Sequence, residues 1–226
     1  MPTFVLSGAH EFLSSAALDA VRFRRADRQY PCVALRDAYN ALPLDAGYLS
    51  ADELDRFSQC GRPSALEPVD ATPVVRRLRK DGVELGLVLF PPLNPGETAP
   101  SPALLRAVLA AGASLADTDL VVALSPWGFQ AERHVLPSLD GTFDVLLGAG
   151  AGAPFPLDIT PFAPGVIWSR SDVDGRHVIE LNVSLPADTG AARPREWLRD
   201  IDVRAREWPL TDDIPADQRV FEALAQ

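Results

Sequence analysis

Residues 83–90 read Val83-Glu-Leu-Gly-Leu-Val-Leu-Phe90, and a pair of prolines closes the run. An apolar run of this length is typical of a strand that is covered on both faces. Ser101-Pro102 then predicts the start of a helix, because serine caps a helix and proline is favoured at its first position, and Gly112 predicts the end. Residues 119–125 form a second apolar run and predict the next strand.

The alternation continues towards the C-terminus. Residues 130–139 predict a short helix, and Phe143–Leu147 predicts a third buried strand. Strands that alternate with helices imply a parallel sheet with the helices packed outside it. Further on, Val166–Arg170 and His177–Leu185 predict an antiparallel hairpin, and a last helix is expected from about residue 216 to residue 224. The expected fold class is α/β, with mainly parallel central strands, flanking helices and a C-terminal antiparallel hairpin.

The N-terminal third has weaker patterns. Thr3–Leu6 predicts a short strand, and Leu13–Tyr39 predicts mainly helix. Residues 56–72 contain glycine and prolines and predict a loop with one short strand. We interpret the basic run Arg76–Lys80 as the solvated end of a helix, because nucleic-acid binding needs a wider basic face.

Composition limits the classes of function. The chain has 226 residues, of which 47% are hydrophobic and 23% are charged, as in an ordinary globular protein. A net charge of −10 opposes binding to phosphate backbones and anionic lipids. The apolar runs are much shorter than the roughly 20 residues of a membrane helix. We therefore expect neither a nucleic-acid partner nor a membrane.

The location of the protein is inferred from its start. The first residues lack the basic and apolar segments of a signal peptide, so we expect a cytoplasmic protein. An incomplete N-terminus would instead be compatible with export. Cys32 and Cys60 are too few for a disulfide framework. The sequence is compatible with one disulfide bridge between them and with two separate buried thiols, and separate thiols are the more common case.

The sequence matches the motifs of cofactor, metal and nucleophile sites only weakly. The run Gly148–Ala153 follows a strand and has glycines spaced as in a dinucleotide fingerprint, but Pro154-Phe155-Pro156 follows where the motif requires a helix. We interpret it as a tight loop. The three histidines, His10, His134 and His177, lack the spacing of a metal-ligand pair, and no nucleophile motif is present. We expect no metal and no cofactor.

Several stretches together resemble the calcineurin-like metallophosphoesterases, in particular their 5′-nucleotidase branch. Gly82–Phe90 is similar to the branch's GvkvGviGl strand, Asp119–Gly128 to its D-hhhhLSH-x-G segment, and Phe143–Ala149 to its iDvilgGHtH segment. Residues 39–45 are more weakly similar to the branch's YDavnlGNHE segment, and residues 214–220 to its IpeDpeV segment. The resemblance implies one metallophosphoesterase-like domain over 1–226 that lacks the first strand of the family.

The metal ligands of that family have no counterparts. The family binds two metal ions through D-x-H, GD, GN-H/E, a lone His and GH-x-H, and these ions activate water and hold the phosphate. D-x-H falls before the start of this sequence, and Asp45 begins the stretch that aligns with GN-H/E. The resemblance places the other ligands on small residues or proline: Ala9, Ala46, Gly47, Pro126, Gly150 and Gly152.

We therefore favour the interpretation that the domain is a catalytically inactive pseudoenzyme. It would act in binding, scaffolding or subunit assembly, with a protein partner or a second copy of the chain. The loops around 125–129 and 148–156 would form the contact surface, with Trp127, Phe129 and Phe155 as candidate residues. For Trp127 a role in packing is the stronger expectation.

Two alternatives keep a phosphate-ester hydrolase. In one, a displaced site uses His10, Glu11 and Asp45, which should then converge beside the Gly148 loop. In the other, a second polypeptide supplies the missing strand and its ligands, and this chain presents an exposed strand edge to it.

Overall fold

The computed structural model describes residues 2–9, 32–94, 96–171, 177–185, 196–211 and 217–224. These residues form one six-stranded sheet in the order β4-β5-β6-β7-β9-β8, a three-stranded sheet in the order β1-β2-β3, and a ribbon of β10 and β11. The strands are β1 (Leu6–Ser7), β2 (Ala46–Ser50), β3 (Leu66–Val69), β4 (Val74–Lys80), β5 (Val83–Leu89), β6 (Leu120–Ser125), β7 (Val145–Gly148), β8 (Phe155–Asp158), β9 (Ile167–Arg170), β10 (His177–Val183) and β11 (Val203–Pro209). The helices are α2 (Cys32–Ala41), α3 (Ala51–Arg56), α4 (Pro102–Ala113), α5 (Phe129–Leu139) and α6 (Gln218–Leu224).

The large sheet follows the alternation that the sequence predicts. Strands β5, β6, β7 and β9 are parallel, and β4 and β8 add antiparallel rims. Helix α4 joins β5 to β6, and α5 joins β6 to β7. Ser101 caps α4 as expected, since its side chain accepts from the backbone N–H of Leu104. The predicted α/β class is confirmed.

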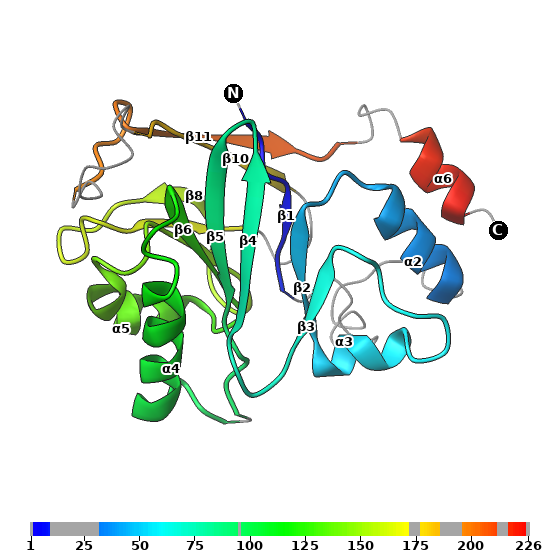
Figure 1. Cartoon of the computed structure of the whole chain (residues 1–226), viewed down its shortest axis with the longest axis horizontal. Coiled ribbons are helices and arrows are strands. Elements are labelled where there is room, and N and C mark those ends of the chain that lie inside the picture. Colours follow the sequence, from blue (N-terminus) through cyan, green and yellow to red (C-terminus); the bar gives the residue numbers. More distant parts are fainter. Residues whose placement is uncertain are drawn as a thin grey trace.

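Three apolar clusters hold the sheets and helices together. Figure 1 shows how these sheets and helices are arranged. One face of the large sheet packs on α4 and α5, with Val88, Ala123 and Leu146 among the buried residues. Its other face packs on the three-stranded sheet and on the β10–β11 ribbon. Beyond the small sheet, α2 and α3 pack around Leu49 and Phe57. The architecture is helices, sheet, sheet, helices.

The basic run is a strand, so the predicted helix end is wrong. Residues 76–80 belong to β4, which pairs with β5 in register from Val74 opposite Leu89 to Lys80 opposite Val83. Asp81 and Gly82 form the two-residue turn, with positive φ values of 47° and 82°. Asp-Gly favours this hairpin turn because both positions require a left-handed backbone.

The C-terminal antiparallel pair is made of other strands than the sequence predicts. The sequence pairs Val166–Arg170 with His177–Leu185, but β9 pairs with β7 and β8, while β10 pairs with β11. Burial explains the difference: every residue of β9 is buried, as in an inner strand, whereas β10 alternates between half-buried and exposed positions. The ribbon therefore covers one face of the core, and its other face meets the solvent.

The last helix packs beside α2, which brings the C-terminal end of the chain to the side opposite α4 and α5 (Figure 1). Among the described residues, every helix is too short or too polar to cross a membrane.

Candidate functional site

The carboxyl ends of the parallel strands gather at one edge of the large sheet. Strands β6, β7 and β9 end there at Ser125, Gly148 and Arg170, which lie side by side in register. A methyl group on Gly8, which follows β1, would lie 4.0 Å from the Ser171 hydroxyl, so the end of β1 reaches the same edge. Ligand sites of open α/β sheets form at such edges, and this edge is the candidate site.

The segment Gly148–Gly152, called here the Gly148 loop, is tied to the segment that follows β6. The amide of Gly128 donates to the carbonyl of Ala149 at 3.0 Å, and the amide of Phe129 donates to that of Ala151 at 2.8 Å. The amide of Ala149 donates to the Ser125 carbonyl at 2.8 Å. The start of α5 and the Gly148 loop therefore form one hydrogen-bonded unit.

A buried ion pair lies beneath this loop. Glu132 of α5 and Arg170 at the end of β9 are 0% and 1% exposed, and their side chains pair directly. The Nη2 group of Arg170 also donates to the carbonyls of Ala149, Gly150 and Ala151, at 3.1, 3.0 and 3.2 Å. The three carbonyls of the loop thus converge on a single cationic group. We call Glu132 and Arg170 the clamp.

Hydrogen bonds compensate in part for burying the clamp. The indole Nε1 of Trp168 donates to the Glu132 carboxylate at 3.1 Å, and the Ser125 side chain also hydrogen-bonds to it. Burial raises the pKa of Glu132, and the charge of Arg170 offsets this effect only in part. A charge pair in this position is stable only while both partners are present.

The positions of the family's GH-x-H ligands do not accept side chains. Gly150 has a φ of +77°, and an added Cβ would lie 2.8 Å from the carbonyl oxygen of Pro126. Gly152 has a φ of +126°, and its Cβ would overlap the Cβ of Phe129. A Cβ on Gly148 would overlap the Glu132 carboxylate. The loop backbone therefore favours glycine at these three positions.

Asp45 lies away from the candidate site. It precedes β2, and its carboxylate accepts from the amide of Val5 and from Lys80 Nζ, both at 2.7 Å. Lys80 is opposite Val83 at the amino end of β5, so Asp45 lies at the edge opposite the Gly148 loop. The structure does not bring Asp45 to this loop. His10 and Glu11 lie outside the described residues.

Ala46 and Gly47, which the resemblance aligned with a ligand loop, lie inside β2. They pair with Leu6 and Ser7 of β1, and a Cβ on Gly47 would overlap the side chain of Leu66. The carboxyl end of β2 is Ser50, which caps α3 together with Glu53 in a reciprocal capping box. The carboxyl end of β2 therefore meets this edge at 50–53, and Ala46 and Gly47 lie at the other end of the strand.

Two further matched positions do lie at the candidate site. Ala9 follows β1 and is partly buried against the core between the sheets. Pro126 follows β6 and presents its carbonyl to Gly150. Neither residue type can ligate a metal through its side chain.

The aromatic residues expected at a contact surface pack inside the edge. Trp127 is 7% exposed, and its indole N–H donates to the Pro91 carbonyl at 2.6 Å. Phe129 stacks on Trp168, with the ring centroids 5.2 Å apart, and Phe155 meets both rings edge to face. All of these rings pack in or against the core cluster to which Trp168, the hydrogen-bond donor to Glu132, also belongs. Trp127 has the packing role that was expected for it.

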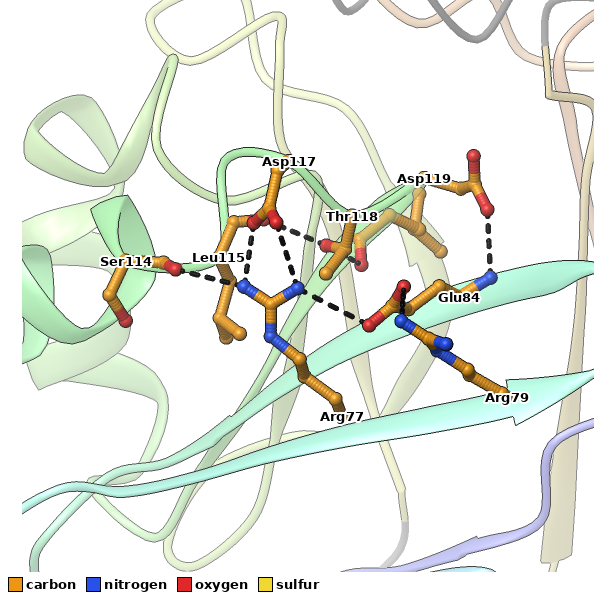
Figure 2. A network of polar contacts seen from close by, with 9 residues as sticks. Arg77, Arg79, Glu84, Ser114, Leu115, Asp117, Thr118 and Asp119 are labelled. Atoms are coloured by element: carbon orange, nitrogen blue, oxygen red, sulfur yellow. Dashed lines mark hydrogen bonds and ion pairs between the residues drawn. The ribbon is translucent and has the colours of Figure 1, made fainter.

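The described residues contain no group of three or more His, Cys, Asp or Glu side chains that could hold a metal ion. An open hollow does lie at the amino edge of β5 and β6, lined by residues that include Lys80, Glu84 and Asp119. Several charges in and beside it are paired: Arg77 binds Asp117 and Glu84, and Arg79 binds Glu84 (Figure 2). Asp119 accepts from the amide of Glu84 at 2.7 Å. The network joins β4, β5 and the turn before β6.

Sequence reasoning missed the clamp. Two signs of it are present in the sequence: Glu132 lies one turn from Val135 and Leu136 on the apolar face of α5, and Arg170 ends a run of buried residues. A charge on an apolar face needs a partner. The sequence does not say which partner, because 38 residues separate the two side chains.

No protein-family model matches the chain, and no curated protein sequence matches it. Solved structures do. The calcineurin-like phosphoesterase YfkN of Bacillus subtilis aligns over 85% of this chain and 72% of its own, with a TM-score of 0.52 and 13% identity. The sulfate thiohydrolase SoxB of Thermus thermophilus, solved with glycerol, aligns over 85% of this chain and 38% of its own, with a TM-score of 0.58 and 15% identity. The NAD nucleotidase NadN of Haemophilus influenzae aligns over 87% and 49%, with a TM-score of 0.49 and 13% identity.

The likeness to YfkN and SoxB extends over 85% of this chain. At these identities it concerns the backbone arrangement and carries no residue roles. This chain has the fold of the calcineurin-like phosphoesterases.

Proposed function

We propose that this protein is a metallophosphoesterase-fold domain without the two-metal hydrolytic centre, and that it acts by binding another protein chain. The observation that carries the proposal is the Gly148 loop. The proposal is supported by the positive φ of Gly150 and Gly152 and by their close contacts with Pro126 and Phe129, which would strain any larger residue at these positions. The guanidinium of Arg170 gathers the loop carbonyls instead.

The surface that supports the binding role is the outer face of the β10–β11 ribbon, called here the ribbon face and made of Val178, Glu180, Arg206 and Trp208. Val178 lies opposite Trp208 in the register, and they are 52% and 40% exposed. The guanidinium carbon of Arg206 lies 3.4 Å from the centroid of the Trp208 ring, and the indole N–H donates to Glu180 at 2.8 Å. An exposed tryptophan that is already oriented loses little freedom on binding, and Trp and Arg are the residues enriched at binding hot spots.

Metal content and phosphatase activity test the first half of the proposal. The purified full chain is analysed for bound metal and assayed on p-nitrophenyl phosphate with added Mn²⁺ or Zn²⁺, with and without a chelator. We expect no stoichiometric metal and no chelator-sensitive turnover. Near-stoichiometric metal together with turnover that the chelator abolishes would overturn the proposal.

A second candidate keeps phosphate-ester hydrolysis through a metal site that another polypeptide completes. Strand β1 favours it: within the described part of the chain β1 pairs with β2 alone, and it ends the order of its sheet. A free strand edge can accept a further strand. Under this candidate, activity would appear on addition of the partner and would be absent from the isolated chain.

A further inference from the structure

Helix α2 and the turn that follows α3 bring two thiols together. Arg36 lies one helical turn after Cys32, and its Nη1 donates to the backbone carbonyl of Cys60 at 2.5 Å. Side chains four residues apart share a helix face, so Cys32 lies on the face that Arg36 directs at this turn. The Cys60 thiol donates to the Gly61 carbonyl at 3.5 Å, and both thiols lie near enough to the Arg36 side chain and to each other to interact electrostatically.

Apolar contacts hold this arrangement in place. Cys60 packs with Leu35 and Tyr39 of α2 against the buried ring of Phe57. Both cysteines are reduced, and each remains partly exposed. The thiols are therefore close to each other and also within reach of a small reagent, which two separate buried thiols would not be.

We propose that Cys32 and Cys60 are a redox-active pair that a low-molecular-weight disulfide oxidises to an intramolecular bridge. The Cys32 thiolate attacks one sulfur of the small disulfide, forms a mixed disulfide and releases one small thiolate. The Cys60 thiolate then attacks the Cys32 sulfur, which closes the protein bridge and releases the second small thiolate. The two thiol protons pass to the released thiolates, so two electrons leave the protein and reduce one small disulfide to two thiols.

The surroundings assign different roles to the two thiols. Burial raises the pKa of the Cys60 thiol to about 11, its interaction with the Cys32 thiol adds to this rise, and Arg36 opposes it, so Cys60 is the slower nucleophile. Cys32 is therefore the thiol that reacts first, and Cys60 is the one that resolves the mixed disulfide.

Mass spectrometry after reaction with glutathione disulfide tests the pair. The reduced, folded full chain is incubated with glutathione disulfide, quenched with acid, alkylated and digested without reductant. We expect the intact chain to lose two hydrogens, to take up no alkyl group, and to yield a linked peptide that contains Cys32 and Cys60. Dithiothreitol should restore both alkylated thiols.

Variants and unfolding provide the controls. Cys60→Ser should accumulate one glutathione adduct on Cys32, and Cys32→Ser should react more slowly on Cys60, both in chains that melt as the wild type does. In urea the wild type should shift from the bridge towards mixed disulfides, because proximity is lost. A folded wild type that carries two stable glutathione adducts, keeps two free thiols, or forms disulfide-linked dimers would overturn the proposal.

Discussion

Arg170 holds the Gly148 loop by charge and by geometry together. Its guanidinium pairs with Glu132 and donates hydrogen bonds to three loop carbonyls, and both side chains of the clamp are buried. Burying two charges is expensive, and apolar residues of similar volume often replace such pairs without loss of stability. We therefore infer that the clamp does more than stabilise the fold. It fixes the position of the loop relative to the start of α5.

Replacing one partner of the clamp should destabilise the fold strongly. Arg170→Met leaves the Glu132 carboxylate buried without its counter-charge and removes the hydrogen bonds to the loop, which should cost about 3–5 kcal/mol of unfolding free energy. Urea denaturation measures the change. Arg106→Met, at an exposed arginine of α4, is the matched control and should leave the curve unchanged. Equal denaturation curves for the two variants would show that the clamp does not stabilise the fold.

The pKa of Glu132 predicts a direction for the dependence of stability on pH. Its value in the folded chain is raised above the ordinary 4.5, so above this pH the folded protein holds a proton that the unfolded chain has lost. The stability that Glu132 contributes is complete below pH 4.5 and falls as the pH rises through the raised pKa. The difference in unfolding free energy between the wild type and Glu132→Gln should therefore decrease from pH 4.5 upwards. A difference that grows with pH would mean that Arg170 dominates and lowers this pKa.

At the scale of elements, the Gly148 loop depends on glycine for two reasons that can be separated. Gly150 and Gly141 have nearly the same φ, +77° and +78°, but a Cβ on Gly150 would crowd the Pro126 carbonyl, whereas Gly141 has open space around it. The pair thus distinguishes backbone strain from overlap with a neighbour.

Alanine substitutions should reveal this difference. Gly141→Ala should lower the unfolding free energy by about 1–2 kcal/mol, the usual cost of a left-handed backbone. Gly150→Ala should lower it by about 1–3 kcal/mol more, because a packed neighbour has to move. Thermal or urea denaturation of the two variants checks the order. A smaller loss at Gly150 than at Gly141 would mean that the loop relaxes easily, and that it could also accommodate larger side chains.

Sequence patterns predicted the elements that depend on local burial. The apolar runs that became β5, β6 and β7 and the Ser101-Pro102 cap of α4 lie within one or two residues of their expected places. The β4–β5 hairpin could also have been predicted, because Asp81-Gly82 is a strong turn signal between two strand-like runs.

Long-range pairing could not be predicted from the sequence. Which strand β10 joins depends on the burial of β9, and the clamp depends on two side chains far apart in the chain. The position of Ala46 and Gly47 within β2 also depends on long-range pairing, because β2 pairs with β1 and β3 and ends at the capping box of Ser50 and Glu53. Glycine-rich loops carry even less information, since many conformations suit glycine.

At the scale of the whole molecule, an acidic protein exposes Val178 and Trp208 on the ribbon face. The net charge of −10 makes two copies repel at long range, and salt screens this repulsion beyond about 8–10 Å. Short-range association through the ribbon face would then depend on Val178 and Trp208. The same face and the same charge would also favour a basic protein partner.

Association of the chain with itself should depend on this face and should strengthen with salt. Sedimentation velocity of the wild type at about 0.15 M salt should show dimer, and Val178→Asp should shift the population to monomer. Val33→Asp is the matched control, because Val33 is 44% exposed on α2 and lies outside the ribbon face. If both variants lose the dimer, or if neither does, the ribbon face is not the surface through which the chain associates with itself.

Strand β4 forms one rim of the large sheet, and rims are where sheet proteins grow into fibrils by adding the rim of another copy. Arg77, Arg79 and Lys80 stand along this rim, and a second β4 laid against it would bring like charges together. The cations that join β4 to Glu84 and Asp45 in the folded chain thus also act as gatekeepers. A concentrated solution of this protein should resist fibril growth from that side for as long as those charges remain.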